Sequence, residues 1–348
     1  MKLCFNAQDR SKWDRLRQII SENDRILKLY AAYLNRMPRF LTGRMVRDLM
    51  RDCDLTREQA FRILFGAAIG LNIAEKPDDR LLDRHYLQPG VRELSASDWS
   101  TDPYLQTIAF PAAHAGHWRL TSEEYLPFEA FVCGNPVREP DGREIPQIGF
   151  FPEKFRFPAV LENGIEWMAV KPNEIATMKE PIAEAYGHVV AFGLGLGYFA
   201  FHAARKPTVS KVTVVERDPS VIALFEEFLL PQFPNQEKIE VIEDDAFDYA
   251  RNRLLKANPD FVFTDLWHDQ SDGLPLYLQM RKVERLTPGA RFAYWIEPIL
   301  LSTLRRMVFD RLDTKEGREI TSYAELESML SDPFLKGLAP NLRSVDHP

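Results

Sequence analysis

The chain of 348 residues is poor in cysteine and has no long apolar run. Its three cysteines, Cys4, Cys53 and Cys133, show no CxxC or CxxH spacing, which predicts reduced thiols and no metal site. No stretch approaches the roughly 18 consecutive apolar residues of a membrane span, and the start of the chain lacks the apolar core of a signal peptide. The sequence therefore predicts a protein with no membrane segment and a cytoplasmic location.

Repeats and low-complexity tracts are also missing, and the composition is that of a globular protein. Because the chain exceeds the usual size of a single-core domain, we expect more than one domain. We predict an N-terminal helical domain over residues 1–95 and a β-rich connecting region over residues 96–170. An α/β domain with a helical C-terminal extension is predicted over residues 171–348.

Basic residues are fewer than acidic residues over the whole chain, but the charge is unevenly distributed along it. Residues 1–70 hold 14 Lys and Arg against 8 Asp and Glu, a net +6, and the remainder holds 30 against 43, a net −13. A basic module can face nucleic acid, yet an acidic body disfavours such a partner. We expect the basic segment to dock on its own acidic body or on a second copy of the chain, so a homo-oligomer remains open.

Apolar residues recur at spacings of three and four between residues 11 and 74, which predicts four helices. Thr56 is placed to cap the last of them, over residues 56–70. Helix pairs of this kind occur in DNA-binding helix-turn-helix motifs and equally in any helical hairpin. Between Pro77 and Pro172, prolines and short β-branched and aromatic runs predict turns and strands, including a hairpin of residues 127–151 and a strand over residues 164–170.

Strands and helices alternate from residue 173 onward. Expected strands cover residues 188–193, 212–217, 239–244, 261–266 and 291–297, with helices between most of them. Such βα units predict a doubly wound, mostly parallel sheet, whose ligands bind beyond the carboxyl ends of the strands. After the last strand, residues 298–312 and 322–332 read as helix, and no final strand hairpin is evident.

The first strand runs into its helix through Gly193, Leu194, Gly195 and Gly197, a turn that lets backbone approach a nucleotide cofactor. The same loop matches the dinucleotide pattern GxGxxA through Ala200, and glycines also serve helix packing. Two further motifs decide between the cofactors. Glu216, next to Arg217, ends the second strand where a carboxylate binds a ribose, and Asp245 with Ala246 follows the third strand, where an acid accepts from an adenine amine.

With these motifs, residues 166–297 resemble class I S-adenosylmethionine-dependent methyltransferases, and are most similar to the spermidine-synthase-like branch. The resemblance implies a Rossmann-like fold with S-adenosylmethionine as cofactor. It places the glycine loop under the methionine part, Glu216 at the ribose, and Asp245 and Ala246 at the adenine. Glu174 and Thr177, early in a helix capped by Asn173, would lie near the amino-acid end of the cofactor.

The fourth strand ends in Asp265, which the resemblance implies lies beside the transferring group as the best catalytic candidate. His268 or Asp269 can act as a base if the acceptor must lose a proton, or can simply begin a loop. Trp267 can stack on a flat substrate or pack as an ordinary core residue. His114 and His117 form an HxxH pair without further close ligands, which predicts no metal site.

The sequence therefore predicts a methyltransferase acting on a small-molecule acceptor. It lacks the NPPY-type tetrad of amino-methylating relatives, and it has DLWHD where aminopropyltransferases usually carry runs like DSSDP. An aminopropyltransferase on the same fold is the first alternative. A cofactor-binding sensor or scaffold without turnover is the second, and a nicotinamide-dependent dehydrogenase is the third.

Overall fold

The computed structural model of the protein describes residues 7–313. Its N-terminal part consists of three helices, not the four expected: α1 (Ala7–Arg36), α2 (Gly43–Cys53) and α3 (Arg57–Ala68). Helix α1 is continuous over 30 residues because no glycine or proline interrupts it before Pro38. Thr56 caps α3 as expected, in a capping box with Gln59.

The middle of the chain forms short helices and strands that pair mostly antiparallel, with β1 and β7 as a parallel pair. The short helices are α4 (Pro77–Leu82), α5 (Gln88–Gly90), α6 (Ala96–Ser100) and α7 (Pro103–Thr107). The strands are β1 (Val91–Glu93), β2 (Ala113–Ala115), β3 (Trp118–Tyr125), β4 (Phe131–Val132), β5 (Val137–Arg138), β6 (Glu144–Ile145), β7 (Ile148–Phe150), β8 (Phe155–Glu162) and β9 (Ile165–Ala169). The expected hairpin is present, since β4 pairs with β7 and β5 with β6.

From residue 172 the predicted α/β pattern is confirmed. Five strands form one parallel sheet in the order β12-β11-β10-β13-β14: β10 (Gly187–Phe192), β11 (Val209–Glu216), β12 (Ile239–Glu243), β13 (Phe261–Thr264) and β14 (Arg291–Tyr294). The helices are α8 (Pro172–Glu184), α9 (Tyr198–Ala204), α10 (Pro219–Leu224), α11 (Ala246–Asn252), α12 (Leu254–Ala257), α13 (Gln270–Glu284) and α14 (Glu297–Asp313). This mixed α/β architecture with a parallel sheet has the strand order of a Rossmann-like fold.

The strand order reverses at the centre of this sheet. β10 lies between β11 and β13, so the chain leaves β10 in one direction and later returns to its other side. The crevice outside the carboxyl ends of β10 and β13 is where doubly wound sheets bind ligands. Gly193 and Asp265 directly follow these two strands, so the topology brings them together.

Three buried clusters of hydrophobic side chains form the core. The largest surrounds the parallel sheet and includes Tyr104 and Trp118 from the middle of the chain. A second joins the N-terminal helices to Phe128 and Phe150, and a third, around Phe151, contains side chains of β4, β8 and β9. The connecting region thus contributes to both neighbouring cores and also forms a cluster of its own.

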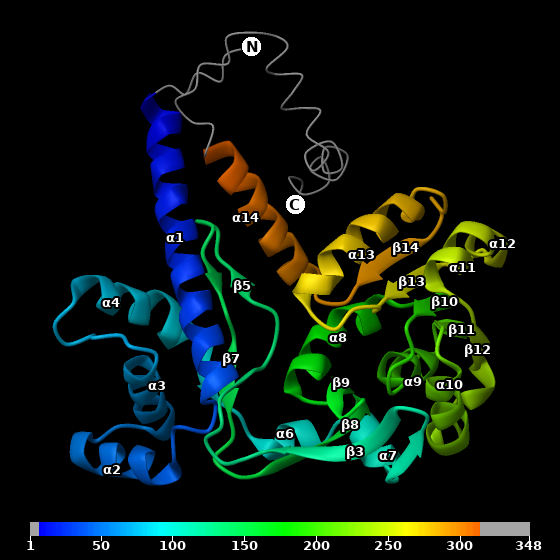
Figure 1. Ribbon diagram of the computed structural model, residues 1–348, viewed down its shortest axis with the longest axis horizontal. Coiled ribbons are helices and arrows are strands. Elements are labelled where there is room, and N and C mark those ends of the chain that lie inside the picture. The colour runs from blue at the N-terminus through cyan, green and yellow to red at the C-terminus, as the bar shows by residue number, and fades with distance from the viewer. Residues whose placement is uncertain (1–6, 314–348) are drawn as a thin grey trace.

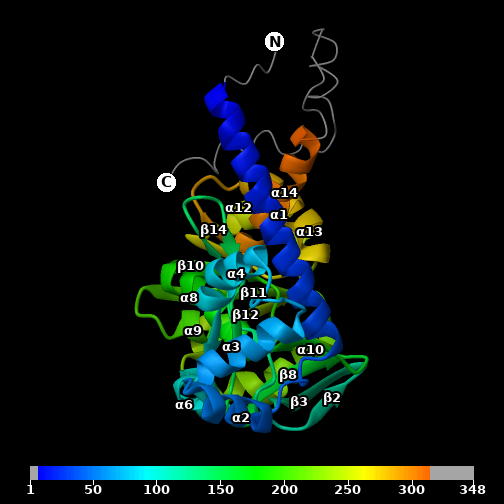
Figure 2. The ribbon, with the colours of Figure 1, turned by 90° about the vertical axis from the view of Figure 1, so that its left-hand side faces the viewer.

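Helices α1 and α14 come together although they are at opposite ends of the chain. Figures 1 and 2 show them side by side, and the rings of Trp13 and Phe309 stack at 4.7 Å between centroids. An ion pair of 3.1 Å joins Asp24 to Arg306. None of the helices in residues 7–313 is long and apolar enough to cross a membrane. The helix predicted over residues 322–332 lies outside the described residues.

Candidate functional site

One cavity of about 950 Å³ lies at the carboxyl ends of the sheet strands. It extends past β9 and the start of α8 to α1 and α14, so it is bounded by all three parts of the chain. Most of the predicted site residues line it: Glu174, Gly193, Leu194, Gly195, Glu216, Arg217, Asp245, Ala246, Asp265, Trp267, His268 and Asp269. Twelve Asp and Glu side chains face four Lys and Arg in this lining, so the cavity is strongly acidic.

The glycine loop has the tight geometry expected of a cofactor cradle. Gly193 has a φ of 94°, and a Cβ there would lie 2.0 Å from the carbonyl oxygen of Asp265. At Gly195 a Cβ would meet the Met168 sulfur at 2.2 Å. Gly197, also predicted to bind the cofactor, is outside the cavity lining and precedes α9, where a Cβ would meet the ring of Phe225. Two of the three glycines therefore face the site.

Glu216 ends β11 and is held by backbone amides. Its Oε1 accepts hydrogen bonds from the N–H groups of Arg217 and Asp218, and its Oε2 accepts one from Leu194 at 3.1 Å. Because a carboxylate offers about four acceptor positions, one position on Oε2 remains for a ligand hydroxyl. Binding both hydroxyls of a ribose requires the Leu194 bond to give way.

Asp245 and Asp244 have different surroundings although they are adjacent. Asp245 caps α11: its Oδ1 accepts from the N–H groups of Phe247 and Asp248, and among residues 7–313 nothing engages its Oδ2. Both oxygens of Asp244 are engaged, one by the amide of Asp245 and the other by Arg253. Asp245, with the buried Ala246 beside it, is thus the residue of this pair available to a ligand.

Two carboxyl groups meet at the end of the cavity beside the glycine loop. Glu174 is buried at the start of α8, and burial raises its pKa to about 7, while Lys171 opposes the shift. Asp265 is half-buried after β13; burial, and then the nearby charge of Glu174, raise its pKa well above the usual value. Lys171 itself is paired with Glu166. The two acids therefore lack a full cationic partner.

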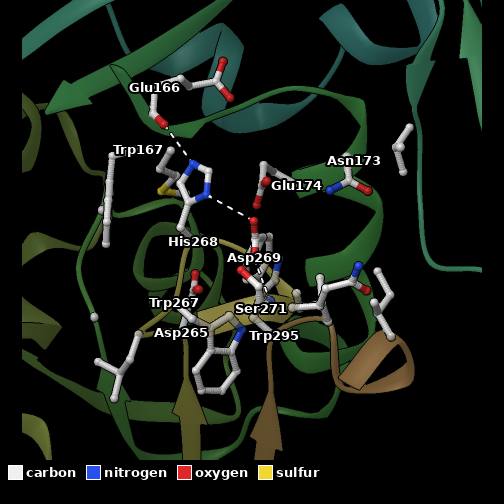
Figure 3. A pocket seen from close by; sticks show the side chains of 18 of the residues that line it. Glu166, Trp167, Asn173, Glu174, Asp265, Trp267, His268, Asp269, Ser271 and Trp295 are labelled. Atoms are coloured by element: carbon white, nitrogen blue, oxygen red, sulfur yellow. Dashed lines mark hydrogen bonds and ion pairs between the residues drawn. The ribbon is translucent and has the colours of Figure 1, made fainter. Parts of the chain in front are cut away.

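Asn173 does not cap α8, contrary to the expectation. Pro172 is already the first helical residue and Lys171 is the N-cap, so Asn173 lies inside the first turn. Figure 3 shows its amide nitrogen pointing toward Glu174, and this amide lowers the pKa of that carboxyl. Thr177, expected near the cofactor, is buried, donates to backbone carbonyls and accepts from the indole of Trp295.

His268 and Asp269 form the exposed rim of the site (Figure 3). The His268 Nε2 lies 3.0 Å from the carbonyl oxygen of Glu166, and its Nδ1 lies 3.9 Å from Asp269. Asp269 caps α13, a helix that was not predicted, so it has a structural role there. Trp267 is only 3% exposed and its ring packs against Gly273 of the same helix. Its position is that of a packed wall residue.

Sequence reasoning missed Ile296, which follows β14 and lines the cavity. It has a φ of 49°, the left-handed region that β-branched residues rarely adopt. Such strain concentrates at functional sites, where the surrounding structure enforces it. Trp295 helps to do so, because its buried indole N–H donates to Thr177 at 2.9 Å. No sequence pattern signals a strained isoleucine.

No family model and no curated protein matches the chain. Among solved structures, it is similar to the spermidine synthase from Thermotoga maritima, with 16% identity and a TM-score of 0.27 over 35% of this chain and 48% of that one. It is also similar to a spermidine synthase in complex with the transition state analogue AdoDATO, with 14% identity and a TM-score of 0.31 over 44% of this chain and 59% of that one. The match thus spans about half the length of these proteins.

Within residues 7–313, no group of three or more His, Cys, Asp and Glu side chains is arranged to hold a metal ion. His117 lies 3.3 Å from Glu162 and 3.8 Å from Asp218, and His114 is exposed on β2.

Proposed function

We propose that the protein is a transferase that alkylates an amine, using an adenosyl sulfonium cofactor bound over the glycine loop. The observation that carries this proposal is the pair Glu174 and Asp265, two poorly compensated acids at the loop end of an acidic cavity. A bound ammonium group compensates both, because it brings a positive charge and several N–H donors into a low-dielectric site. Amines are therefore the ligands that this end of the cavity favours.

The residues present fit the adenosine part of such a cofactor. Gly193 and Gly195 leave a cradle that a Cβ would fill. Glu216 has an acceptor position for a ribose hydroxyl, and Oδ2 of Asp245 is free to accept from an adenine amine. The three groups follow β10, β11 and β12, which are neighbours in the sheet. This supports the adenosyl cofactor over a dinucleotide.

The charges at the other end favour the decarboxylated form of S-adenosylmethionine, and hence aminopropyl transfer. Glu174 and Asp265 suit an ammonium group but repel a carboxylate. The nearest cation, Lys171, is already paired with Glu166. This reverses the order of the two transferase hypotheses that the sequence alone suggests, because burial of Glu174 is not visible in the sequence.

When bound, such a cofactor supplies an electrophilic carbon whose bond to the sulfonium sulfur breaks, the electron pair staying on sulfur. Glu174 would hold the ammonium group of the cofactor, and Asp265 would hold the acceptor amine and take the proton that its nitrogen loses as the new N–C bond forms. A carboxyl group with a raised pKa is a better proton acceptor than an ordinary one at neutral pH. Trp267 and Leu266 help to exclude water from this end.

Methyl transfer from S-adenosylmethionine is the second candidate. It is favoured by the segment after β13, in which the packed Trp267 and the rim residue His268 stand between Asp265 and the next acid, Asp269. In that case the pair of acids holds the ammonium group of the cofactor, and His268 accepts the proton of the acceptor.

Calorimetry with the two cofactor forms separates these candidates. We expect tighter binding of decarboxylated S-adenosylmethionine, together with aminopropyl transfer to amines. The Asp265→Asn variant should retain cofactor binding but lose turnover by about 100-fold or more, whereas Asp98→Asn, at an exposed site, should change neither. Tighter binding of S-adenosylmethionine with methyl transfer would establish the second candidate. Tight binding without any turnover would instead indicate a sensor.

A further inference from the structure

The antiparallel sheet β2-β3-β8-β9 supplies one wall of the cavity. Trp118 of β3 and Glu162 of β8 are directly opposite each other, so their side chains lie on the same face of this sheet. Val160, two residues before Glu162 and therefore on that face as well, lines the cavity together with both of them. The face of the wall that is turned toward the cavity thus carries a carboxylate, Glu162.

The indole of Trp118 fixes where this wall lies. Its Nε1 donates to Oδ2 of Asp218 at 2.8 Å, and the backbone N–H of Asp218 donates to Oε1 of Glu216 at 2.9 Å. Nε2 of His117 lies 3.8 Å from the same aspartate oxygen and 3.3 Å from Oε1 of Glu162. One chain of contacts therefore joins Glu162 on the wall to Glu216 at the end of β11.

We propose that Glu162 is a second ribose-binding residue, which accepts a hydrogen bond from one hydroxyl of the cofactor while Glu216 accepts from the other. This inference rests on the proposed function, since the ribose is that of the adenosyl cofactor. The two hydroxyls need two acceptors, but Glu216 offers only one open position because three backbone amides occupy the others. The ribose is thus held between the parallel sheet and the opposite wall.

Glu162 is the acid on this side of the cavity that has acceptor capacity left. His117 approaches its Oε1, and within residues 7–313 no hydrogen bond or ion pair engages its Oε2. Its side chain is 37% exposed although the residue lines the cavity. The carboxylate of Asp218, by contrast, is already surrounded by two backbone amides, the Trp118 indole and His117. A ligand hydroxyl that enters here therefore finds its free acceptor on Glu162.

The test measures calorimetric binding of 5′-methylthioadenosine, which has the ribose of the cofactor but no group to transfer. We expect Glu162→Ala to weaken this binding about tenfold, the effect of losing one hydrogen bond to a charged group. Glu162→Gln should restore part of the affinity, because the amide oxygen still accepts from a hydroxyl. Glu123→Ala, at an exposed position of β3 outside the cavity lining, is the matched control and should leave binding unchanged.

Deoxy analogues of the same ligand separate a direct contact from a structural effect. The 2′-deoxy and 3′-deoxy forms each lack one hydroxyl, and Glu162→Ala should lose affinity for only one of them, the form that keeps the hydroxyl bound by Glu162. If Glu162→Ala weakens the parent ligand and both deoxy forms equally, or weakens none of them, the inference is overturned.

These outcomes are distinct from a failure of the proposed function, because binding of the nucleoside requires no transfer. If no amine is alkylated but the deoxy pattern holds, the proposed function is wrong and Glu162 still binds a ribose. If transfer occurs and Glu162→Ala binds 5′-methylthioadenosine as the wild type does, the function stands and the inference is overturned. Absence of any binding by the wild-type protein would also overturn the inference.

Discussion

Glu174 shows how one buried residue links the stability of this protein to its chemistry. A carboxyl group loses hydration when it is buried, and its charged form is destabilised unless cations or donors replace the water. Here the Asn173 amide and the partly engaged Lys171 replace it only in part, which leaves the pKa of Glu174 at about 7. The fold therefore carries an energetic cost at this position that a bound cation relieves.

The first prediction concerns the pH dependence of stability. Between the usual pKa of 4.5 and the folded-state pKa of about 7, the folded protein binds more protons at Glu174 than the unfolded chain does. The free energy of unfolding therefore falls as the pH rises through this window. Glu174→Gln removes the penalty, so at about pH 8 the variant should be more stable than wild type by about 1 to 3 kcal/mol.

Urea unfolding monitored by circular dichroism across this pH range checks the prediction. The two proteins should converge near the acidic end of the window, where Glu174 is protonated in both states. Glu180→Gln is the control, because Glu180 is exposed on the same helix and should show no such pH dependence. A wild-type stability that rises between these two pH values would contradict the account.

For single residues, the sequence predicted which side chains are candidates for the site, but it did not predict which groups surround each of them. Glu216, Asp245 and Asp265 were found because polar residues after parallel strands meet at one edge of the sheet. The burial of Glu174 and the ion pair of Lys171 with Glu166 depend on how α8 packs against β9 and the glycine loop. Such contacts join residues far apart in sequence, and no local pattern encodes them.

At the scale of elements, the glycine loop depends on the close approach of β10 and β13. Gly193→Ala places a methyl group against the carbonyl of Asp265 in a left-handed backbone conformation. We expect a loss of about 3 kcal/mol or more in the free energy of unfolding, and weaker cofactor binding, since the ends of both strands must shift. Denaturant unfolding and cofactor titration measure the two effects.

Gly164 provides the matched control for this substitution. It has a φ of 83° in the turn between β8 and β9, and a Cβ there meets nothing within 4 Å. Gly164→Ala should thus cost only the backbone strain, about 1 to 2 kcal/mol, with cofactor binding unchanged. Equal losses in the two variants would show that the contact with Asp265 has no role.

The glycine loop is also held from behind by Tyr104 of α7. The Tyr104 side chain is fully buried, and its hydroxyl donates to the carbonyl oxygen of Leu196 at 2.5 Å. Tyr104→Phe should cost about 0.5 to 1.5 kcal/mol in stability and weaken cofactor binding several-fold, because the loop loses its anchor. Tyr186→Phe, at a position 44% exposed, is the control. Cofactor binding that is unchanged in Tyr104→Phe would rule out an anchoring role.

Element prediction succeeded where the periodicity was strong and local. The five parallel strands are apolar runs followed by polar residues, and all five were predicted. Helix α13 was missed because Gly273 and Pro275 interrupt its pattern. Strand β8 was missed for a similar reason, since Pro158 lies in its middle and its pairing with the polar β3 is a tertiary contact.

At the scale of the whole molecule, the basic N-terminal segment is neutralised in part by ion pairs within the chain. Arg39 pairs with Glu129 of the connecting region, and Arg57 pairs with Glu93. Arg51 pairs within α2 with Asp48 and Asp52. The charge asymmetry that the sequence shows is thus used in part for docking this segment on the rest of the chain.

The last prediction follows from this distribution of charge. Binding to nucleic acid requires cations that are free to replace the counterions of the phosphates, whereas here several arginines of the helical segment already contact carboxylates and the net charge is −7. Fluorescence anisotropy with a labelled mixed-sequence DNA duplex should show no binding up to about 10 μM protein at about 0.15 M salt.

The same measurement at lower salt is the internal control, since weak electrostatic contact should appear there and vanish as salt is added. Saturable binding that persists at the higher salt would contradict this prediction. It would mean that the helical segment presents a basic face despite these ion pairs, and that α2 and α3 are candidates for binding nucleic acid.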